Sequence, residues 1–270
     1  GFCGRMDMMI AGGAAIDPQI LQFFRDLGIM ALQGYGLTET APIAALTPDF
    51  DPRVGSAGKA VYGDEIKVKN PNEKGEGELL IRGETVMLGY YEDPAATAAV
   101  MEDGWFNSGD VGYMDEDGFI YITGRSKNVI VTQNGKNIYP EEIETLLSKV
   151  PEIAESMVYG KEVAGEKELI ITARVIPNYE EIENLHAAER KEPSAAFTEE
   201  EIYKIIWNQI KQVNRKLSNY KCIRKLEIKS GQFAKTSTMK IKRFAELASD
   251  DAKEMPAVEN AAPAATENEQ

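Results

Sequence analysis

The sequence predicts a chain of mixed α and β structure: a partial α/β sheet, then a small barrel-like antiparallel sheet, then an α+β domain. Three observations predict it. Short apolar segments flank a helix-forming segment in residues 8–32, and short strands broken by glycine and acidic turns fill residues 55–122. Residues 199–217 then place apolar side chains at helical spacing. With 270 residues and 43% apolar content, the chain has enough apolar side chains to form such cores.

The α/β part begins with a predicted strand at residues 8–11, which runs into small residues. Asp17 followed by Pro18 is typical of a helix cap with proline at the first helical position, so we expect a helix over residues 19–27. Residues 30–32 form the next predicted strand, with a Gly-Tyr-Gly loop at its end. A strand–helix–strand unit indicates a sheet whose ligands bind at the carboxyl edge.

Alternating apolar and polar residues predict short strands in the middle of the chain, at residues 65–68, 77–82 and 119–122. Residues 115–118 (DEDG) are typical of a hairpin turn. Together these segments indicate a small antiparallel sheet or barrel that packs on the first part.

A third pattern starts after Arg125, where residues 129–131 form a predicted strand and residues 134–137 a turn. Pro140 stands where a helix would begin, and the two acidic residues after it favour the positive end of the helix dipole. Residues 169–175 are a further predicted strand.

The rest of the chain alternates polar and helical segments. Residues 178–198 are polar and predict a loop or insertion. The helix predicted within residues 199–217 repeats its apolar side chains along one face: Ile202, Ile205, Ile206, Ile210, Val213 and Leu217. Residues 245–270 are rich in Ala, Glu, Pro and Asn, with seven acidic residues against one lysine and few large apolar side chains to anchor them, which is typical of a disordered tail.

Charge and cysteine content exclude several function classes. The formal net charge of −14 argues against a general nucleic-acid or anionic-membrane binder, because such surfaces need clustered Lys and Arg. Cys3 and Cys222 provide neither a metal spacing nor a disulfide framework, which fits a reducing cytoplasm. No apolar run is long enough to span a bilayer. The single histidine, His186, lies in a polar stretch, so neither a catalytic triad nor a zinc site is expected.

Four short blocks occur in one order along the chain: residues 33–40 (QGYGLTET), 105–110 (WFNSGD), 124–128 (GRSKN) and 235–243 (KTSTMKIKR). Each block alone is compatible with an ordinary loop. In this order and at this spacing they resemble the ATP-handling motifs of the adenylate-forming superfamily, which includes acyl-CoA synthetases, luciferases and peptide-synthetase adenylation domains. The resemblance covers about residues 9–243.

The resemblance implies a two-step reaction that uses ATP, Mg²⁺ and CoA. A carboxylate attacks the α-phosphate of ATP to give an acyl-adenylate and pyrophosphate, and a thiol then takes the acyl group. It also implies a domain division: residues 1–123 as the carboxyl-terminal part of a large AMP-binding domain, 124–127 as a hinge, 128–244 as a small mobile domain, and 245–270 as the acidic tail.

The first block implies roles in holding the nucleotide. Tyr35 resembles the aromatic residue beside adenine, and Gly34 and Gly36 would leave the backbone room to approach the ligand. Thr38 would hydrogen-bond phosphate, and Glu39 would hold Mg²⁺ directly or through water. The alternative is a strand-to-helix turn with a capping threonine and a glutamate in the first turn.

The second and third blocks imply contacts to ribose and a hinge. Asp110 resembles the aspartate that accepts both ribose hydroxyls, and Arg125 the arginine that reaches ribose or phosphate. Lys127 falls at the hinge position, and Gly135 would let the pantetheine thiol pass in the second step. The alternatives are a turn residue for Asp110 and a surface arginine for Arg125.

The last block implies the catalytic residue, Lys240, which in the family reaches the carboxylate and α-phosphate in the first step only. A flexible ammonium suits this role because it acts as a mobile point charge. The alternative is a solvated basic face, since Lys240, Lys242 and Arg243 form a charge run. Ala234 and Met239 stand where the common pattern has proline and glycine, which puts the geometry of this loop in question.

A small-residue loop at Gly12, Gly13 and Ala14 resembles the one that contacts adenine and borders the acyl pocket. A plain tight turn accounts for these residues nearly as well.

Residues 86–91 and 135–140, with the Lys-Thr-Ser-Thr of the last block, resemble bacterial long-chain fatty-acid–CoA ligases more than peptide synthetases. The expected partners are a fatty acid, ATP and CoA, with peripheral membrane contact to obtain the fatty acid and no nucleic acid. A ligase for aryl or medium-chain acids is one alternative. A non-catalytic nucleotide-binding or interaction module that keeps the fold is the other.

The family's Ser/Thr/Gly-rich loop around the β- and γ-phosphates has no counterpart before Gly12, and the acyl tunnel has no room there. We therefore expect the chain to correspond to the carboxyl-terminal half of a ligase whose amino-terminal half is missing. On this expectation the chain alone does not adenylate.

Overall fold

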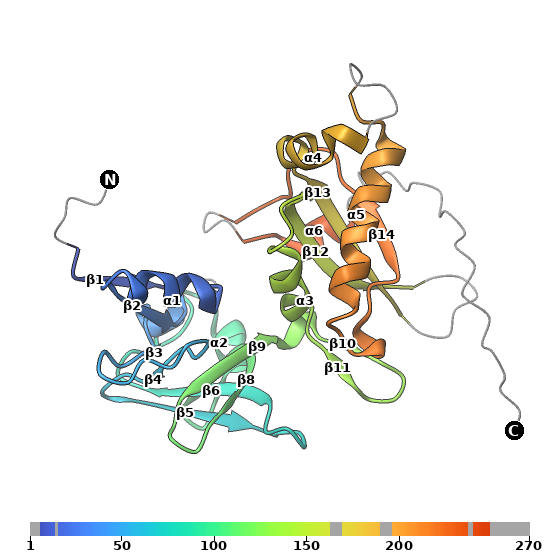
Figure 1. Ribbon diagram of the computed structural model, residues 1–270. Coiled ribbons are helices and arrows are strands. Elements are labelled where there is room, and N and C mark those ends of the chain that lie inside the picture. The colour runs from blue at the N-terminus through green and yellow to red at the C-terminus, as the bar shows by residue number, and fades with distance from the viewer. Residues whose placement is uncertain (1–5, 14–15, 163–168, 190–195, 237–239, 249–270) are drawn as a thin grey trace, which may run out of the picture. The chain divides into compact units, whose positions relative to one another are not determined.

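A computed structural model describes residues 6–13, 16–162, 169–189, 196–236 and 240–248 (Figure 1). The chain forms two compact units. One comprises Gly1–Lys149 with Val158–Leu169, and the other Val150–Met157 with Ile170–Gln270. The domain boundaries expected at residues 123 and 128 remain a prediction.

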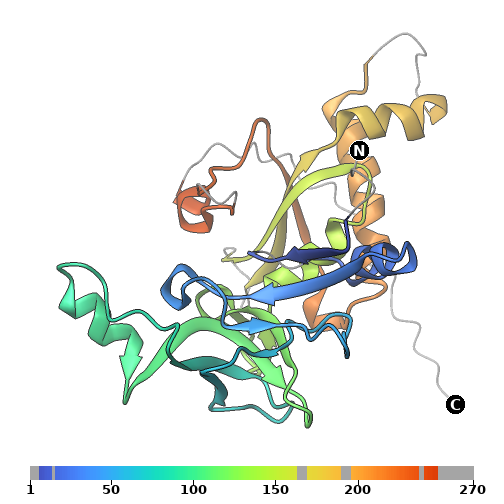
Figure 2. The same ribbon diagram turned by 90° about the vertical axis from the view of Figure 1, so that its left-hand side faces the viewer.

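The first unit opens with the strand–helix–strand motif that the sequence predicts, made of β1 (Met8–Ala11), α1 (Pro18–Asp26) and β2 (Met30–Tyr35). The two strands are parallel and lie side by side in Figure 2. Asp17 caps α1, because its Oδ1 accepts a hydrogen bond from the Gln19 N–H at 2.9 Å.

The expected loop at the Gly-Tyr-Gly sequence is wrong. β2 continues through Gly34 and Tyr35, which pair antiparallel with Leu46 and Ala45 of β3 (Ala45–Leu46). β3 pairs in turn with β4 (Lys59–Ala60), which gives a sheet of order β1-β2-β3-β4. Hydrogen bonding to β3 decides the conformation here, and glycine by itself does not end the strand.

The antiparallel sheet predicted for the middle of the chain is present (Figure 1). Its strands are β5 (Asp64–Lys69), β6 (Gly77–Gly83), β7 (Met101–Glu102), β8 (Trp105–Met114) and β9 (Ile120–Arg125). The order is β5-β6-β8-β7, with β9 also paired to β8. One hydrophobic core joins this sheet to the segment around β3. Its buried side chains include Leu79, Ile81, Phe106 and Ile120.

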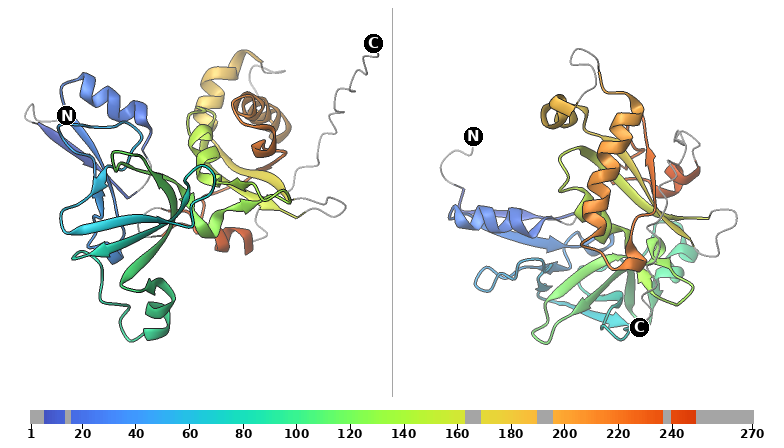
Figure 3. Two further views of the ribbon diagram at one scale, coloured as in Figure 1. Left: turned by 90° about the horizontal axis from the view of Figure 1, so that it is seen from below. Right: turned by 45° about the vertical axis from the view of Figure 1, so that its right-hand side comes forward.

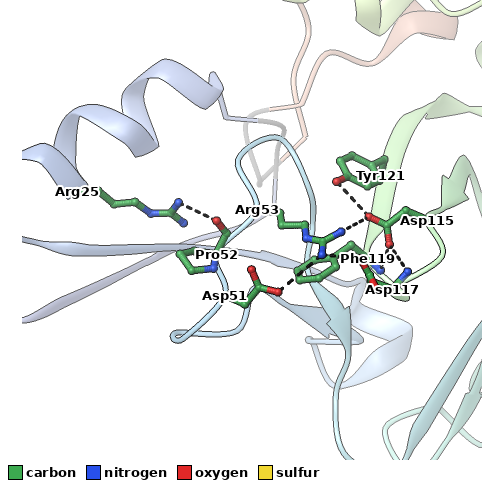
Figure 4. A network of polar contacts seen from close by, with 8 residues as sticks. All are labelled: Arg25, Asp51, Pro52, Arg53, Asp115, Asp117, Phe119 and Tyr121. Carbon is green, nitrogen blue, oxygen red and sulfur yellow. Dashed lines mark hydrogen bonds and ion pairs between the residues drawn. The ribbon is translucent and has the colours of Figure 1, made fainter.

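The β8–β9 hairpin is anchored by an arginine from the loop after β3 (Figure 4). Arg53 Nη1 lies 2.8 Å from Asp115 Oδ2, and Nη2 lies 2.6 Å from Asp117 Oδ2. The guanidinium also stacks 4.1 Å from the centre of the Phe119 ring. The predicted turn at residues 115–118 is confirmed, because the Gly118 N–H donates to the Asp115 carbonyl at 3.0 Å.

A second arginine ties the same loop to the first helix. Arg25 of α1 donates through Nε and Nη2 to the Ala31 carbonyl at 3.1 and 2.9 Å, and through Nη1 to the Pro52 carbonyl at 3.3 Å. The two arginines therefore connect α1, the loop and the β8–β9 hairpin within the first unit.

The remaining elements follow in chain order. They are α2 (Pro94–Val100), β10 (Ile130–Val131), β11 (Asn137–Ile138), α3 (Pro140–Leu147), β12 (Ile153–Lys161), β13 (Ile170–Pro177), α4 (Tyr179–His186), α5 (Glu199–Asn214), β14 (Lys225–Ile228) and α6 (Arg243–Ala248). The described residues also form 3₁₀ turns at Thr38–Thr40, Ser126–Asn128, Ala187–Glu189 and Asn219–Lys221. The helix start predicted at Pro140 is confirmed.

The second unit contains a sheet of order β12-β13-β14, whose first strand is shared with the first unit. β13 and β14 run parallel, and α5 lies alongside them (Figure 3). The predicted helical face is confirmed, because Ile202, Ile205, Ile206, Ile210 and Val213 of α5 are all buried. Leu217 lies beyond the end of the helix.

Two predictions for this part are wrong. Residues 178–198 are not all loop, because α4 forms there with Asn178 as its cap and a single buried apolar residue, Ile182. The tail does not begin at residue 245, because residues 243–248 form α6 and Glu246 is buried. One buried side chain per short helix is too weak a pattern to be read from the sequence.

Within the part of the chain that the structure describes, no helix is both long enough and apolar enough to cross a membrane.

Gly58 directly precedes β4, and its carbonyl accepts a hydrogen bond from β9. Substituting this glycine tests how closely the neighbouring backbones of the first unit pack. Gly58 has a φ of +90°, and a Cβ there would lie 1.9 Å from the Leu46 carbonyl carbon. We expect Gly58→Ala to lower the free energy of unfolding by about 4 kcal/mol, through backbone strain and a clash that neither backbone relieves cheaply.

Gly75→Ala is the matched control. Its φ is +79°, but a Cβ there meets nothing within 4 Å, so only the strain of about 1 kcal/mol applies. Denaturant unfolding of both variants measures the difference. An equal decrease in the free energy of unfolding for the two variants would show that close contact with β3 is not the reason that residue 58 must be glycine.

Candidate functional site

Three of the predicted site residues meet at the edge of the first unit's sheets. The Tyr35 hydroxyl donates to Asp110 Oδ2 at 2.8 Å, and Arg125 Nε lies 3.0 Å from Asp110 Oδ1. Tyr35 ends β2, Asp110 lies in β8, and Arg125 ends β9 directly opposite Asp110 in the strand register. The structure thus brings together residues that are far apart in sequence.

The conformation of β8 places Asp110 in this cluster. The alternative of a turn residue for Asp110 is not what the structure has, because residues 105–114 form one strand with an irregularity at this point. Gly109 adopts a φ of +69° inside the strand. The Ser108 hydroxyl donates to the Leu79 carbonyl at 2.8 Å and accepts from the Asp110 N–H at 3.1 Å, which holds the bulged segment to β6.

Burial and charge set the protonation of this cluster. Burial raises the pKa of the Tyr35 phenol well above its ordinary value, and the negative charge of Asp110 raises that pKa further. The phenol therefore stays protonated and donates to the carboxylate, whose side chain is only 7% exposed. Arg125 is 47% exposed, so its charge neutralises Asp110 while part of its guanidinium faces solvent.

Tyr35 and Arg125 each engage one oxygen of the Asp110 carboxylate. An ionised carboxylate accepts hydrogen bonds from hydroxyl groups, and this is the chemistry of the sugar contact implied for Asp110.

Glu39 and Thr38 lie in the 3₁₀ turn Thr38–Thr40, which follows β2. The capping threonine of this turn is Thr40, whose hydroxyl accepts from the Leu37 N–H at 3.0 Å. Thr38 is exposed. Because Thr40 caps this turn, Thr38 does not have the capping role that was its alternative to binding phosphate.

Tyr90 is a neighbour of Glu39 that sequence reasoning missed. Its hydroxyl donates to Glu39 Oε1 at 2.9 Å, and the Met87 N–H donates to the Glu39 carbonyl at 2.8 Å. The negative charge of Glu39 and partial burial raise the pKa of the Tyr90 phenol, with burial the larger cause. No spacing rule links positions 51 residues apart, so the sequence carried no signal for this pair.

The glycines of the first block have different surroundings. A Cβ on Gly36 would lie 2.0 Å from the Pro42 carbonyl oxygen, so packing against the following loop requires glycine there. A Cβ on Gly34 would meet Leu46 at an ordinary 3.5 Å. Gly12 approaches the same strand, with a Cβ position 3.3 Å from the Gly34 carbonyl, and Gly13 has a φ of +84°. Ala14 lies outside the described residues.

Lys127 and Gly135 occupy turns after β9. Lys127 lies in the 3₁₀ turn Ser126–Asn128, where the Ser126 hydroxyl donates to the Gly109 carbonyl at 3.2 Å. Gly135 lies in the predicted turn between β10 and β11 with a φ of +72°, and a Cβ there would meet nothing within 4 Å. This turn is therefore open at its tip.

Lys240 belongs to the second unit, whereas Tyr35, Asp110 and Arg125 belong to the first. It is exposed and adjoins the bridge between Lys235 and Ile241 that closes a short hairpin. The Thr236 N–H donates to the Lys240 carbonyl at 2.8 Å, and the Lys240 N–H donates to the Thr236 hydroxyl at 3.1 Å. Met239, where the sequence departs from the common pattern, lies outside the described residues.

Among the described residues, no group of three or more His, Cys, Asp or Glu side chains is placed to hold a metal ion. A Mg²⁺ ion that is bound mainly through phosphate oxygens and water needs only one or two carboxylates. Glu39 fits that simpler requirement, since Tyr90 engages one of its oxygens through a single hydrogen bond.

Two matches to one protein family cover most of the chain. Residues 2–91 match the family described as AMP-binding enzyme, and residues 127–249 match the AMP-binding enzyme C-terminal domain. The chain belongs to the adenylate-forming AMP-binding enzyme family. The prediction from the four sequence blocks is confirmed.

Curated relatives of this chain include CoA ligases for different acids. The long-chain-fatty-acid–CoA ligase FadD15 of Mycobacterium bovis is 34% identical over 249 residues, which cover 89% of this chain and 40% of that protein. The 2-succinylbenzoate–CoA ligase of Geobacillus kaustophilus is 40% identical over 163 residues, which cover 57% of this chain and 32% of that protein. The chain thus spans less than half the length of these relatives.

Solved structures confirm the predicted fold class. The o-succinylbenzoate CoA synthetase of Bacillus subtilis, in complex with its acyl-adenylate intermediate, matches with a TM-score of 0.73 at 25% identity over 91% of this chain and 47% of that chain. The same synthetase in complex with ATP and a magnesium ion matches with a TM-score of 0.70 at 26% identity, over 88% of this chain and 45% of that chain.

The Tyr35–Asp110 pair makes a testable prediction about ionisation. We expect Asp110→Asn to lower the pKa of Tyr35 but to leave it above the ordinary value, because burial, the larger cause, remains. The unfolded state loses this proton near pH 10, before the folded state does, so the stability that the phenol contributes declines as pH rises above about 10. NMR titration of labelled tyrosine rings, assigned with Tyr35→Phe, measures the shift.

Tyr203 is the internal control, because burial alone raises its pKa. Its titration should not respond to Asp110→Asn. A Tyr35 titration equally insensitive to the substitution would contradict the electrostatic coupling of the pair.

Proposed function

We propose that the protein carrying this sequence activates a carboxylic acid with ATP and transfers the acyl group to CoA. The single observation that carries the proposal is the cluster of Tyr35, Asp110 and Arg125, which brings three of the four sequence blocks into one site. Membership of the AMP-binding family supports the same reaction class.

The proposed roles follow the chemistry of each side chain. Asp110 accepts the ribose hydroxyls, and Arg125 donates to ribose or to a phosphate oxygen through its exposed guanidinium. Tyr35 presents its ring beside adenine while its hydroxyl orients the Asp110 carboxylate. Gly12, Gly13 and Ala14 border the adenine, in keeping with the approach of Gly12 to β2.

Charge is the main obstacle in the first step, because an anionic acid must approach a polyanionic nucleotide. Glu39, held by Tyr90, and the exposed hydroxyl of Thr38 are the proposed groups toward Mg²⁺ and phosphate. Magnesium bound there would neutralise phosphate charge. The Lys240 ammonium then supplies the cation for the carboxylate and α-phosphate, where charge develops in the transition state.

The second step requires the pantetheine thiol of CoA to enter the site. The turn at Gly135 is proposed to admit it, since the tip of this turn is open around its Cα. Lys127 is the proposed hinge, at a 3₁₀ turn between β9 and β10 where a change in a few dihedral angles suffices to reorient the chain beyond it.

A long-chain fatty acid is the proposed substrate. The match to the long-chain-fatty-acid–CoA ligase of Mycobacterium bovis covers 89% of this chain, whereas the match to the 2-succinylbenzoate ligase of Geobacillus kaustophilus covers 57%. The alternative is an aryl acid, favoured by the 40% identity of that shorter match.

Pyrophosphate release dependent on ATP, Mg²⁺ and acid tests the reaction, measured on the whole protein with fatty acids of increasing length and with aryl acids. We expect Lys240→Ala to lower the rate of acid-dependent release about 1,000-fold, because it removes the cation directed at the developing charge. Lys242→Ala, an exposed lysine of the same charge run, is the matched control and should stay within about twofold.

Equal effects of the two substitutions would contradict the catalytic role of Lys240 and favour a solvated basic face. Release supported by aryl acids and not by fatty acids would replace the proposed substrate while leaving the reaction class intact.

Nucleotide binding tests the cluster separately. We expect Asp110→Asn to weaken AMP binding about tenfold, since an amide cannot accept from both hydroxyls as a carboxylate does. Asp64→Asn removes a similarly buried carboxylate of the same antiparallel sheet, bound to Thr85, and should leave the affinity for AMP unchanged. Calorimetric titration with AMP measures both, and equal affinities in all three proteins would exclude Asp110 from the nucleotide site.

A further inference from the structure

A network of buried charges lies in the second unit, apart from the residues considered above. Arg174 of β13 faces Glu227 of β14 across the parallel strands, with Nε and Nη2 at 3.0 and 2.9 Å from Glu227 Oε2. Their side chains are only 7% and 1% exposed. The third donor of Arg174, Nη1, reaches the backbone carbonyl of Glu246 in α6 at 2.7 Å.

Glu246 carries the second pair of this network. Its Oε2 lies 3.2 Å from Lys229 Nζ, and both side chains are at most 6% exposed. Its Oε1 accepts from the Ala234 N–H at 2.5 Å. One carboxylate therefore neutralises a buried lysine and holds the backbone at the start of the segment that carries Lys240.

The same segment is closed at its other end. The Lys242 N–H donates to the Ala234 carbonyl at 2.8 Å, and the Glu246 N–H donates to the Lys242 carbonyl at 3.0 Å. Ala234, Lys242 and Glu246 thus form a closed ring of hydrogen bonds, the base of the segment that carries Lys240. In Figure 2, α6 is the short helix at the red end of the coloured chain.

A third contact supports the first arm of the hairpin. Lys235 Nζ lies 2.8 Å from Glu155 Oε1 of β12, with side chains 23% and 30% exposed. This pair is partly exposed, so solvent screens it. The buried carboxylate of Glu246 joins the Ala234 end of the segment to α6, and backbone hydrogen bonds join the Lys242 end to Ala234 and to Glu246.

We propose that Glu246 is a positioning residue for Lys240, and this inference rests on the proposed catalytic role of that lysine. Buried ion pairs stabilise a fold no more than an apolar pair of the same size would, and often less. What this pair supplies is a defined geometry at the base of the hairpin. A displacement of about 1 Å at a reacting group reduces a rate about 100-fold, so the base controls the delivery of the ammonium.

The two half-reactions separate positioning from general loss of structure. We expect Glu246→Ala to lower acyl-adenylate formation about 100-fold and to leave thioester formation from supplied acyl-adenylate and CoA within about twofold. The reason is that Lys240 is proposed to act in the first step only. Added to Lys240→Ala, the same substitution should cause no further loss of adenylation.

Two further variants guard against simple misfolding. Glu246→Gln keeps an oxygen for the Ala234 N–H and loses only the charge opposite Lys229, so its adenylation rate should lie between those of the wild type and Glu246→Ala. Glu152→Gln alters another buried carboxylate of the second unit, bound to Gln209 and His186, and should change neither half-reaction.

The outcomes distinguish this inference from the proposed function. Equal losses in both half-reactions for Glu246→Ala, or adenylation as fast as wild type, would overturn the positioning role alone. An undiminished adenylation rate in Lys240→Ala would overturn both, since no lysine would then need to be positioned. The Lys242 amide should exchange its hydrogen faster in Glu246→Gln than in the wild type. This result would support the positioning role, because the Lys242 N–H donates to Ala234 within the base.

Discussion

A buried carboxylate must be neutralised or hydrogen-bonded, and this constraint organises the first unit. Asp110 lies inside a sheet, and Arg125 and Tyr35 reach its two oxygens. Arg125 arrives through the β8–β9 register, whereas Tyr35 comes from β2 of the other sheet, so both the register and the packing of the two sheets place these partners. Arg53 also supports this arrangement. Its contacts with Asp115 and Asp117 tie the loop after β3 to the β8–β9 hairpin, which supplies Arg125.

The same constraint operates in the second unit with a different result. There the buried carboxylates of Glu227 and Glu246 are matched by Arg174 and Lys229, and nothing in the pairs faces solvent appreciably. The proposed catalytic lysine is exposed, and the base of its segment is held by buried and hydrogen-bonded groups. A flexible lysine side chain on a well-ordered backbone suits the proposed role of Lys240, because its ammonium must enter the site for one step and leave it for the next.

Local chemistry predicted much of the chain correctly. The Asp17 cap, the Asp-Glu-Asp-Gly turn and the apolar face of α5 depend on neighbours within a few residues, so the sequence expresses them directly. The predicted Gly-Tyr-Gly loop failed because a distant strand decides the conformation there: pairing with β3 extends β2 through Gly34 and Tyr35. In the same way, the contacts of Ser108 with β6 keep Asp110 in a strand and not in the turn that was its alternative.

The sequence by itself determined the class of the chain and its motif residues, because the order and spacing of the four blocks are properties of the chain alone. The tertiary structure decided which of them meet and what supports them: Tyr35 with Asp110, Tyr90 with Glu39, and Glu246 with the base of the Lys240 hairpin. Each of the first two pairs joins strands or loops more than fifty residues apart. The third depends on a six-residue helix whose pattern is too short to predict. Burial of charge, which forces such partners together, exists only once the chain has folded.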